Sequence, residues 1–310
     1  MRGSATLRGG VNVLLATYNG SKFLREQLDS IDSQTLPASK ITVRDDGSAD
    51  GTLSLLEAWA AGRSGICLLR GPRLGVANNF FALLGNQDED SEYFAFCDQD
   101  DVWLPEKIER AVLGLREYAV DEPLMYFSRV ELVDENLKHL SFSRVPKRIG
   151  FTNALVENVA IGCTVVLNRT ARNLICERLP QRALLHDWWC YLAIGALGKV
   201  IFDETPGIKY RQHGNNQIGG TTSRLESFKR RMERFFRPRG GSQRRSDQAE
   251  EFKRCFGGLL SAGHKGVLDR FLFVRGSIRE RISYSAAMDV CRQSWLDGAL
   301  LRVMILMGRV

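Results

Sequence analysis

Residues 94–103 read FAFCDQDDVW, an apolar run that ends abruptly in three carboxylates. The run from 93 to 97 has the length and composition of a buried strand, so the acids follow the carboxyl end of that strand. Open α/β sheets place their ligands at this edge. If the strand geometry continues, Asp98 and Asp100 project to one side while Gln99 and Asp101 point away. Two carboxylates on one side suit a hard divalent cation, whereas an acidic, solvated turn is the competing interpretation of the motif alone.

The segments around this stretch alternate between strands and helices. Apolar runs predict strands, and apolar residues at helical spacing predict helices. Before the acidic motif we expect strands at 11–16, 41–43 and 66–69 and helices at 21–33, with Ser21 as N-cap, 52–61 and 75–85. After it we expect helices at 105–118 and from 186 to about 197, and strands at 124–127, at 159–167 with an interruption at 162–164, and at 200–202. The segment 208–216 closes the compact part of the chain. This order predicts an α/β fold with a mixed, mostly parallel central sheet flanked by helices.

The composition is typical of a soluble globular protein, with 310 residues of which 44% are hydrophobic and 25% charged. Residues 1–10 are polar and basic, and the first apolar run is too short for a signal sequence or a membrane span. The seven cysteines are scattered without a Cys-x-x-Cys pair, which indicates reduced thiols. We therefore expect a cytoplasmic protein.

The net charge of +7 is unevenly distributed along the chain. Residues 221–310 contain 19 Lys and Arg against 9 Asp and Glu, whereas residues 1–220 contain 24 against 27. We therefore divide the chain into an α/β main domain, 1–220, and a basic helical extension, 221–310. Seven basic residues between 224 and 239 alternate with leucine and phenylalanine, which predicts an amphipathic helix on an anionic membrane surface. Packing on the main domain, or a contact between copies of the chain in a homo-oligomer, is the alternative.

Five motifs follow one another in the body of the chain. They are ATYNG at 16–20, VRDDGSADGT at 43–52, GVANNF at 75–80, DQDDVW at 98–103 and HDWW at 186–189. In this order the motifs resemble those of the inverting family 2 glycosyltransferases of GT-A fold, over about residues 11–220. The motif sequences are most similar to those of bacterial rhamnosyltransferase-like enzymes, which share DQDDxW, HDWW and a later YRxHGxN, here at 210–216.

This resemblance implies roles for the residues after the predicted strands. Asp46 would accept a hydrogen bond from the imide of uracil or thymine, in a cleft that the segment Thr17, Tyr18 and Asn19 lines. Asp98 would hold the ribose or share the metal. Asp100 would ligate Mg²⁺ or Mn²⁺ at the donor diphosphate, where the cation stabilises the leaving group. Asp101 is either a support for these ligands or a residue that fixes the following turn.

The HDWW motif is expected to carry the base. Inversion requires one group that takes the proton of the attacking hydroxyl, and the resemblance assigns this role to Asp187. A helix N-cap is the alternative for an aspartate at this place. The neighbouring Trp188 and Trp189 offer a flat platform for a sugar, although one helix cannot turn both toward it. His186 is also placed in the acceptor or sugar pocket.

Three further candidates are weaker. His213 is a possible additional metal ligand or diphosphate contact, and Arg211 a possible phosphate contact; a structural hydrogen bond is the alternative for a histidine in a loop. The Gly162 and Cys163 pair would line the acceptor or sugar pocket, and a bulge in a buried strand explains it equally well.

The resulting hypothesis is a metal-dependent inverting glycosyltransferase that transfers L-rhamnose from dTDP-L-rhamnose to a growing, lipid-linked surface glycan at the inner face of the cell membrane. A UDP-hexose or UDP-N-acetylhexosamine donor is the alternative within the same chemistry. A non-catalytic scaffold that binds lipid or glycan is the alternative of another class. The slightly acidic body argues against a nucleic-acid partner, and the turn at 17–20 lacks the basic, glycine-rich loop of a sugar nucleotidyltransferase.

Overall fold

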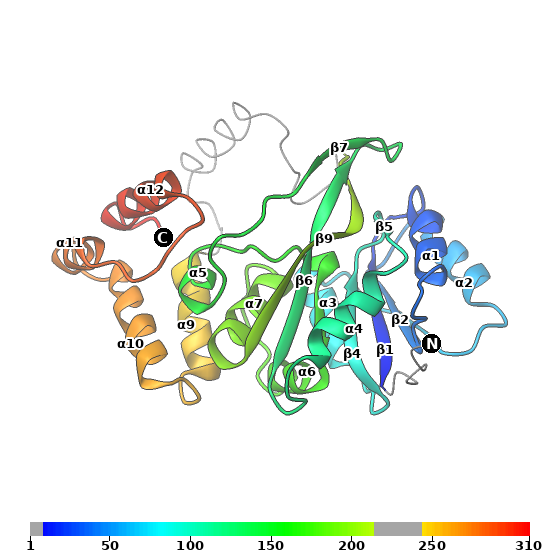
Figure 1. Ribbon diagram of the computed structural model, residues 1–310, viewed down its shortest axis with the longest axis horizontal. Helices are drawn as coiled ribbons and strands as arrows, with labels where there is room; N and C mark the ends of the chain where they lie inside the picture. The colour runs from blue at the N-terminus through cyan, green and yellow to red at the C-terminus, as the bar shows by residue number, and fades with distance from the viewer. Residues whose placement is uncertain (1–8, 214–243) are drawn as a thin grey trace, which may run out of the picture.

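The computed structural model describes residues 9–213 and 244–310, and every structural statement below concerns these residues. One mixed sheet crosses the molecule, with helices on both of its faces (Figure 1). A group of helices from the end of the chain packs beside the sheet at one side of the molecule. This is the α/β architecture that the alternating pattern predicts.

The first half of the chain repeats a strand followed by a helix. The elements are β1 (Gly10–Thr17), α1 (Leu24–Asp32), β2 (Lys40–Asp45), α2 (Thr52–Ala60), β3 (Ile66–Arg70), α3 (Val76–Gly85) and β4 (Ser91–Cys97). The four strands pair in parallel in the order β3-β2-β1-β4. The order reverses direction at β1, which is where open α/β sheets leave a crevice for ligands.

The second half adds antiparallel strands. Its elements are β5 (Val102–Trp103), α4 (Lys107–Arg116), β6 (Leu124–Val133), β7 (His139–Phe142), α5 (Phe151–Ala154), the 3-10 turn Gly162–Thr164, β8 (Val166–Asn168), α6 (Arg169–Cys176), α7 (His186–Leu197) and β9 (Lys199–Arg211). The sheet continues from β4 through β8, β6 and β9 to β5, and β7 pairs with β6. Strand β8 runs antiparallel to β4 and to β6, whereas β6 and β9 are parallel.

The structure refines three expectations about local structure. The interruption expected at 162–164 is a 3-10 turn, and of the strand expected at 159–167 only the short β8 forms after it. The strand predicted at 200–202 continues to Arg211 as β9, because β6 pairs with both halves and the register shifts between Ser128 and Val130. Helix α1 begins only at Leu24 and has no side-chain cap, so Ser21 is not its N-cap.

Alternate residues of the central strands enter two cores. Phe94 and Phe96 of β4 face α3, α6 and α7, whereas Tyr93, Ala95 and Cys97 face α1, α2 and α4. This is the two-residue period of a strand buried on both faces. Both faces of β4 are therefore packed against helices up to the point where the acidic motif begins.

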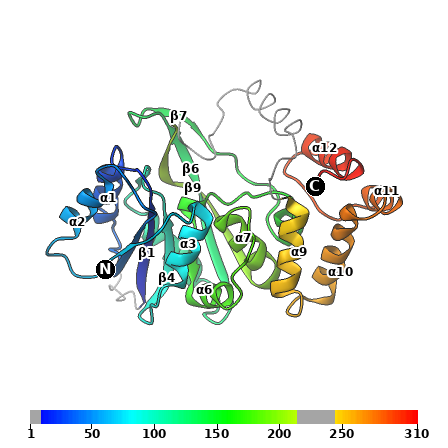
Figure 2. The same ribbon diagram turned by 180° about the vertical axis from the view of Figure 1, so that it is seen from behind.

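The C-terminal helices share the first of these cores. They are α9 (Arg245–Phe256), α10 (Ala262–Phe271), α11 (Ile278–Ala286) and α12 (Trp295–Leu306). Seen from behind, α9 lies next to α7 (Figure 2). Phe252 and Phe256 of α9 contact Trp189 of α7, with ring centroids 6.0 and 5.9 Å away. The predicted amphipathic helix at 224–239 lies outside the described residues. No described helix is long and apolar enough to cross a membrane.

Candidate active site

The carboxyl ends of β1, β2 and β4 lie side by side, because β1 pairs in parallel with both other strands. The loops that follow these strands therefore meet at one edge of the sheet, the upper edge in Figure 1. The backbone N–H of Asp46 donates to the Thr17 carbonyl at 2.9 Å, and the Thr17 hydroxyl donates to Asp45 Oδ1 at 2.9 Å. The residues predicted after these strands are thus brought together.

Asp45 shapes the turn after β2. Its Oδ2 accepts from the backbone N–H groups of Gly47 at 3.1 Å and Ser48 at 2.8 Å. Gly47 has a φ of 84°, a left-handed conformation that favours glycine. The carboxylate oxygens of Asp45 therefore accept hydrogen bonds from protein groups.

Asp46 has a different environment. It is only 3% exposed, and its carboxylate accepts from Arg44 Nη1 at 2.7 Å and from the N–H groups of Leu74 at 2.7 Å and Gly75 at 2.8 Å. Burial opposes ionisation, but these N–H groups and the guanidinium outweigh it and lower the pKa of Asp46. A carboxylate has about four acceptor positions. Three are used here, so one remains for the N–H of a ligand.

The loop after β1 is held from several sides. Asn19 adopts a φ of 48°, and its backbone N–H donates to Ser48 Oγ at 2.8 Å. The Tyr18 ring lies under the Arg73 guanidinium, 4.2 Å from its centroid. The side chain of Gln99 bonds to the backbone of Tyr18 and so joins this loop to the acidic motif. The alternation of side chains along a strand predicts only that Gln99 points away from the acids. It does not predict the bonds between Gln99 and the Tyr18 backbone.

The acidic motif gathers three carboxylates at the end of β4. Asp100 Oδ2 is 2.7 Å from His213 Nε2, so two of the predicted metal ligands are in contact. Burial, and after it the charges of Asp100 and Asp187, raise the pKa of Asp98. Asp98 is thus close enough to both to interact with each.

Asp101 points into the protein. It is fully buried, and its Oδ1 accepts from the backbone N–H of Arg211 at 3.0 Å. Burial, Asp100 and Asp98 raise its pKa well above the usual value. It fixes the start of the segment that follows the motif, in line with the structural alternative for this residue.

The acids fit a hard divalent cation. Ligand atoms of Asp98, Asp101 and Cys163 lie within 4.8 Å of one another, whereas the predicted set of Asp98, Asp100 and His213 forms no such group among the described residues. Asp101 Oδ2 is buried without a hydrogen-bond partner in the described part of the chain. Carboxylate oxygens are the ligands that Mg²⁺ and Mn²⁺ prefer. Burial raises the pKa of the Cys163 thiol well above its usual value, so this soft group stays protonated and does not fit such an ion.

The Arg211 side chain is buried and bonded to protein groups. Its Nε donates to the Asp100 carbonyl at 2.9 Å, its Nη1 to the Glu135 carbonyl, and its Nη2 to Glu26. The guanidinium also stacks on Phe23 at 4.4 Å. Arg211 therefore holds the acidic motif against α1 and the β6–β7 hairpin, while its predicted contact with phosphate stays a prediction.

Asp187 stands in the first turn of α7 and is 5% exposed. Burial raises the pKa of Asp187 to about 6, against the opposing effect of N–H donors. One donor is the Trp188 backbone N–H at 2.7 Å, and another is Asn158 Nδ2, 3.0 Å from Asp187 Oδ2. Asn158 is a functional candidate that the sequence did not reveal, because a single asparagine in a loop has no pattern.

His186 is 5% exposed and stacks on Phe80, with ring centroids 3.8 Å apart. Neither ring nitrogen has a hydrogen-bond partner within residues 9–213 and 244–310. Burial lowers the pKa of His186 to about 3, so the imidazole is neutral. A Cβ on Gly162 would lie 3.1 Å from His186 Nε2 and 3.4 Å from Asp187 Oδ2. Glycine at 162 lets the backbone approach both groups closely.

The two tryptophans after Asp187 point in different directions. Trp189 is completely buried against α9, so it belongs to the core and is not part of a sugar pocket. Trp188 is partly buried, and its Nε1 donates to the Ala154 carbonyl at 2.6 Å. Only Trp188 retains an exposed part that a sugar is able to reach.

Carboxylates from three loops at the carboxyl edge of a GT-A-like sheet define the class of the protein, which is a glycosyltransferase. A sequence model described as "Glycosyl transferase family 2" matches residues 12–171. The chain therefore belongs to glycosyl transferase family 2.

Individual relatives agree with this assignment. The "dTDP-rhamnosyl transferase RfbG" of Shigella flexneri is 31% identical over 234 residues, which cover 70% of this chain and 77% of that protein. Two solved structures share the fold. Staphylococcus aureus TarS, crystallised with UDP-GlcNAc, has a TM-score of 0.55 at 16% identity and covers 96% of this chain and 81% of its own. The mannosyltransferase PcManGT of Pyrobaculum calidifontis, in complex with GDP-Man and Mn²⁺, has a TM-score of 0.52 at 18% identity, covering 98% and 82%.

Proposed function

We propose that the protein transfers L-rhamnose from dTDP-L-rhamnose to a hydroxyl of a growing surface glycan, with inversion at the anomeric carbon. The 31% identity to a protein named as a dTDP-rhamnosyl transferase supports this donor. A UDP-sugar is the alternative donor, since a neighbour of the same fold is crystallised with UDP-GlcNAc. The acceptor glycan is carried on a lipid at the inner face of the cell membrane.

The observation that carries this proposal is the encounter of Asp187 with the acidic motif. Asp187 is buried and bonded to Asn158, and a Cβ on Gly162 would lie 3.4 Å from Asp187 Oδ2. The next residue, Cys163, has its Sγ within 4.8 Å of a carboxylate oxygen of Asp98, so one turn adjoins both acids. A carboxylate with a pKa of about 6 is mostly ionised at neutral pH and still a competent proton acceptor. Direct displacement with inversion requires such a base beside the acceptor hydroxyl, on the face of the anomeric carbon opposite the diphosphate.

Each residue then has a defined task. Asp46 accepts a hydrogen bond from the imide N–H of the thymine or uracil ring with its remaining acceptor position. This position lies beside the loop of Thr17, Tyr18 and Asn19. Asp98, Asp100 and His213 would hold Mg²⁺ or Mn²⁺, which when bound neutralises charge on the diphosphate.

The reaction is a single displacement. The acceptor oxygen attacks the anomeric carbon from the face opposite the diphosphate and forms the new glycosidic bond. The bond between that carbon and the diphosphate oxygen breaks, and dTDP leaves with the electron pair. Asp187 takes the proton of the acceptor hydroxyl.

A thermal-shift panel tests the donor and the metal together. The purified chain is heated with dTDP, UDP, GDP or CDP, each with and without Mn²⁺. A ligand that binds only the native state raises the midpoint according to its affinity. We expect the largest shift with dTDP and Mn²⁺ together. A larger shift with UDP would assign the alternative donor, and no shift with any nucleotide on folded protein would overturn the proposal.

A further inference from the structure

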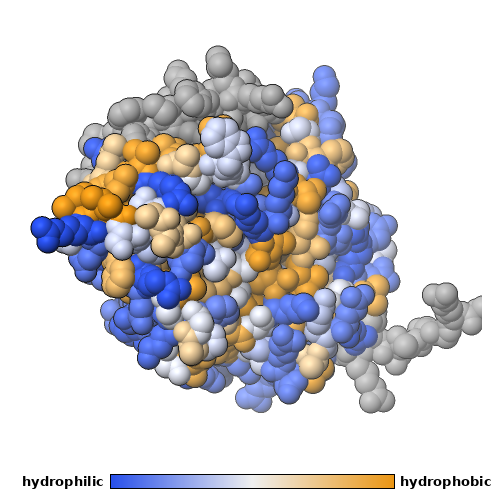
Figure 3. Space-filling view, turned by 60° about the vertical axis from the view of Figure 1, so that its left-hand side comes forward, coloured by the Kyte–Doolittle hydropathy of each residue, from blue (hydrophilic) through white to orange (hydrophobic). Residues whose placement is uncertain are grey.

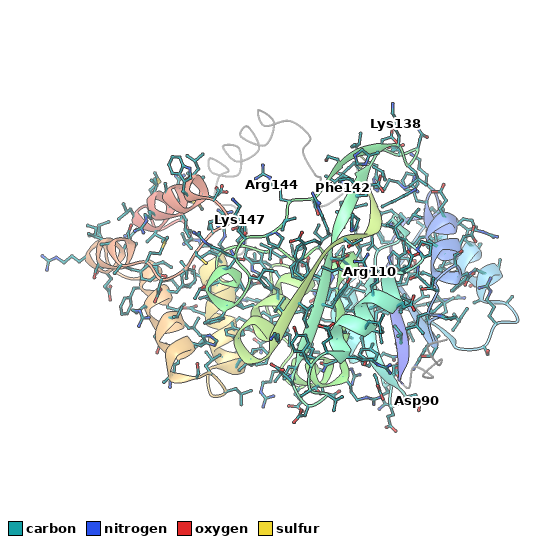
Figure 4. The ribbon with its side chains drawn as sticks, in the orientation of Figure 1. Asp90, Arg110, Lys138, Phe142, Arg144 and Lys147 are labelled. Carbon is teal, nitrogen blue, oxygen red and sulfur yellow. The ribbon has the colours of Figure 1, made fainter. Side chains whose placement is uncertain are left out.

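The segment that contains β7 and leads to α5, residues 138–149, has an unusual composition. It reads KHLSFSRVPKRI, with four Lys and Arg and no acidic residue. Four of its apolar side chains are also exposed, namely Leu140, Phe142, Val145 and Ile149. Figure 4 shows Lys138, Phe142, Arg144 and Lys147 along one edge of the molecule, the upper edge of the view. We call residues 138–149 the basic rim.

Of the four basic side chains of the rim, Arg148 donates to the Arg292 carbonyl at 2.6 Å, and the other three are not used inside the described part of the protein. Lys138, Arg144 and Lys147 are exposed. Within the part of the chain that the structure describes, none of these three side chains forms a hydrogen bond or an ion pair. Elsewhere on the surface many basic residues are paired, for example Arg63 with Asp32. The charge of the rim is therefore available to an external partner.

The rim borders the active site at both ends. On one side, Arg211 ties the β6–β7 hairpin to the acidic motif through the carbonyls of Glu135 and Asp100. On the other side, the rim leads into α5, whose Ala154 carbonyl accepts from Trp188 beside the proposed base. A surface bound to the rim would thus lie next to segments that hold the acidic motif and the proposed base.

The exposed apolar surface continues beyond the rim. The Gln293 side chain accepts from the Lys147 backbone N–H at 2.7 Å and donates to the Arg148 carbonyl at 2.6 Å. The next helix, α12, begins with Trp295, which is 79% exposed, and Leu296. Hydrophobic and hydrophilic side chains alternate over this end of the molecule (Figure 3).

We infer that the basic rim, together with Trp295 and Leu296, docks on the surface of an anionic lipid bilayer. Tryptophan and other aromatic side chains favour the membrane–water interface, and basic side chains near anionic headgroups add electrostatic attraction. A second copy of the chain fits less well, because two rims without acidic residues would repel each other. Docking on the membrane would bring the enzyme to the lipid-linked acceptor of the proposed function. The evidence for the docking, however, does not depend on that proposed function.

Co-sedimentation with vesicles tests the inference without donor or acceptor. The full chain is mixed with vesicles of phosphatidylglycerol and phosphatidylcholine, or of phosphatidylcholine alone. We expect binding to the anionic vesicles only. The double variant Arg144→Gln/Lys147→Gln is expected to bind roughly thirty-fold more weakly. The control Lys199→Gln/Lys265→Gln removes two exposed charges outside the rim and should bind as the parent chain does.

An apolar pair of variants separates docking on lipid from simple charge attraction. Phe142→Ser should weaken vesicle binding, whereas Val120→Ser, at another exposed apolar position, should not. Equal binding by the two double variants would overturn the inference. A dimer detected by sedimentation velocity that Trp295→Ser dissociates would also overturn the inference. So would binding to soluble dextran sulfate that is as strong as binding to vesicles and is unchanged in Phe142→Ser. Nucleotide thermal shifts of the rim variants report separately on the active site.

Discussion

The side-chain amide of Gln99 exchanges two hydrogen bonds with the backbone of Tyr18. Tyr18 N donates to Gln99 Oε1 at 2.8 Å, and Gln99 Nε2 donates to the Tyr18 carbonyl at 3.0 Å. One side chain thus bridges the loops that follow β1 and β4. The loop proposed to hold the nucleoside and the motif proposed to hold the diphosphate are therefore fixed relative to each other.

Replacing Gln99 by methionine should weaken nucleotide binding. Methionine has a similar length but no hydrogen-bonding amide, so it leaves both Tyr18 groups unpaired at a cost of about 1–3 kcal/mol. We expect the Kd for dTDP with Mn²⁺, measured by calorimetry, to rise by roughly ten- to a hundred-fold. Gln87→Met, at an exposed position, is the matched control. Unchanged affinity in Gln99→Met would mean that the bridge does not order the site.

Gly20 is expected to be required because of the space that Gln99 occupies. A Cβ at residue 20 would lie 2.1 Å from Gln99 Oε1, whereas a Cβ on Gly85 would meet no atom within 4 Å. Gly20→Ala should therefore destabilise the protein and Gly85→Ala should not. In a double-mutant cycle by urea denaturation, Gly20→Ala should cost less free energy when Gln99 is already alanine. Additive losses would show that the clash is with other atoms.

The sequence contained enough information to predict which strand ends form the site. Thr17, Asp46 and Asp98 follow apolar runs, and the carboxyl ends of neighbouring parallel strands converge at one edge. The sequence did not allow the hydrogen-bond partners of Gln99 and Asn158 to be predicted. Single amides in loops have no periodicity, and their bonds depend on how distant segments pack.

The errors in the second half of the sheet have a similar cause. The strand expected at 200–202 continues as β9 through Pro206 and Gly207, which form an irregularity opposite β6. Proline is tolerated at such irregular positions. Helix α11 was not expected, since its buried residues, Tyr284 and Ser285, give no apolar stripe.

Lys107 lies buried beneath the acidic motif and should be a source of instability. It is 2% exposed, its Nζ lies 3.4 Å from the Trp103 ring centroid, and it has no hydrogen-bond partner among the described residues. Burial lowers its pKa from 10.5 to about 8. Keeping the charge in the native state therefore costs about 3 kcal/mol at neutral pH.

Lys107→Met should accordingly raise the free energy of unfolding at pH 7. Below pH 8 the lysine is charged in both states, so the advantage of methionine is complete. As the pH rises from 8 toward 10.5, the native lysine loses its proton first, the parent chain gains stability, and the advantage shrinks. Urea denaturation at pH 7 and pH 9.5 measures the difference. The exposed Lys265→Met serves as control, and a loss of stability at both pH values would contradict this account.

The pH dependence of transfer should report on Asp187. Protonated Asp187 cannot accept a proton, so kcat/KM should fall about tenfold for each pH unit below a pKa of about 6. Asn158 Nδ2 donates to Asp187 Oδ2 and favours its ionised form. Without this donor the pKa of Asp187 rises, so Asn158→Ala should move the acid limb upward by roughly one pH unit.

The measurement is a pH–rate profile at saturating Mn²⁺, with Asn136→Ala as the exposed control. If Asn158 is only structural, Asn158→Ala should lower the rate at every pH without moving the acid limb of the profile. A shift of that limb would show that Asn158 acts through Asp187. Asp187→Asn should abolish transfer while leaving the dTDP-dependent thermal shift intact. The N-cap of α7 is Leu185, so the capping alternative for Asp187 is wrong. Substantial transfer in that variant would remove Asp187 as the base and leave it only its bonds to the Trp188 backbone and Asn158.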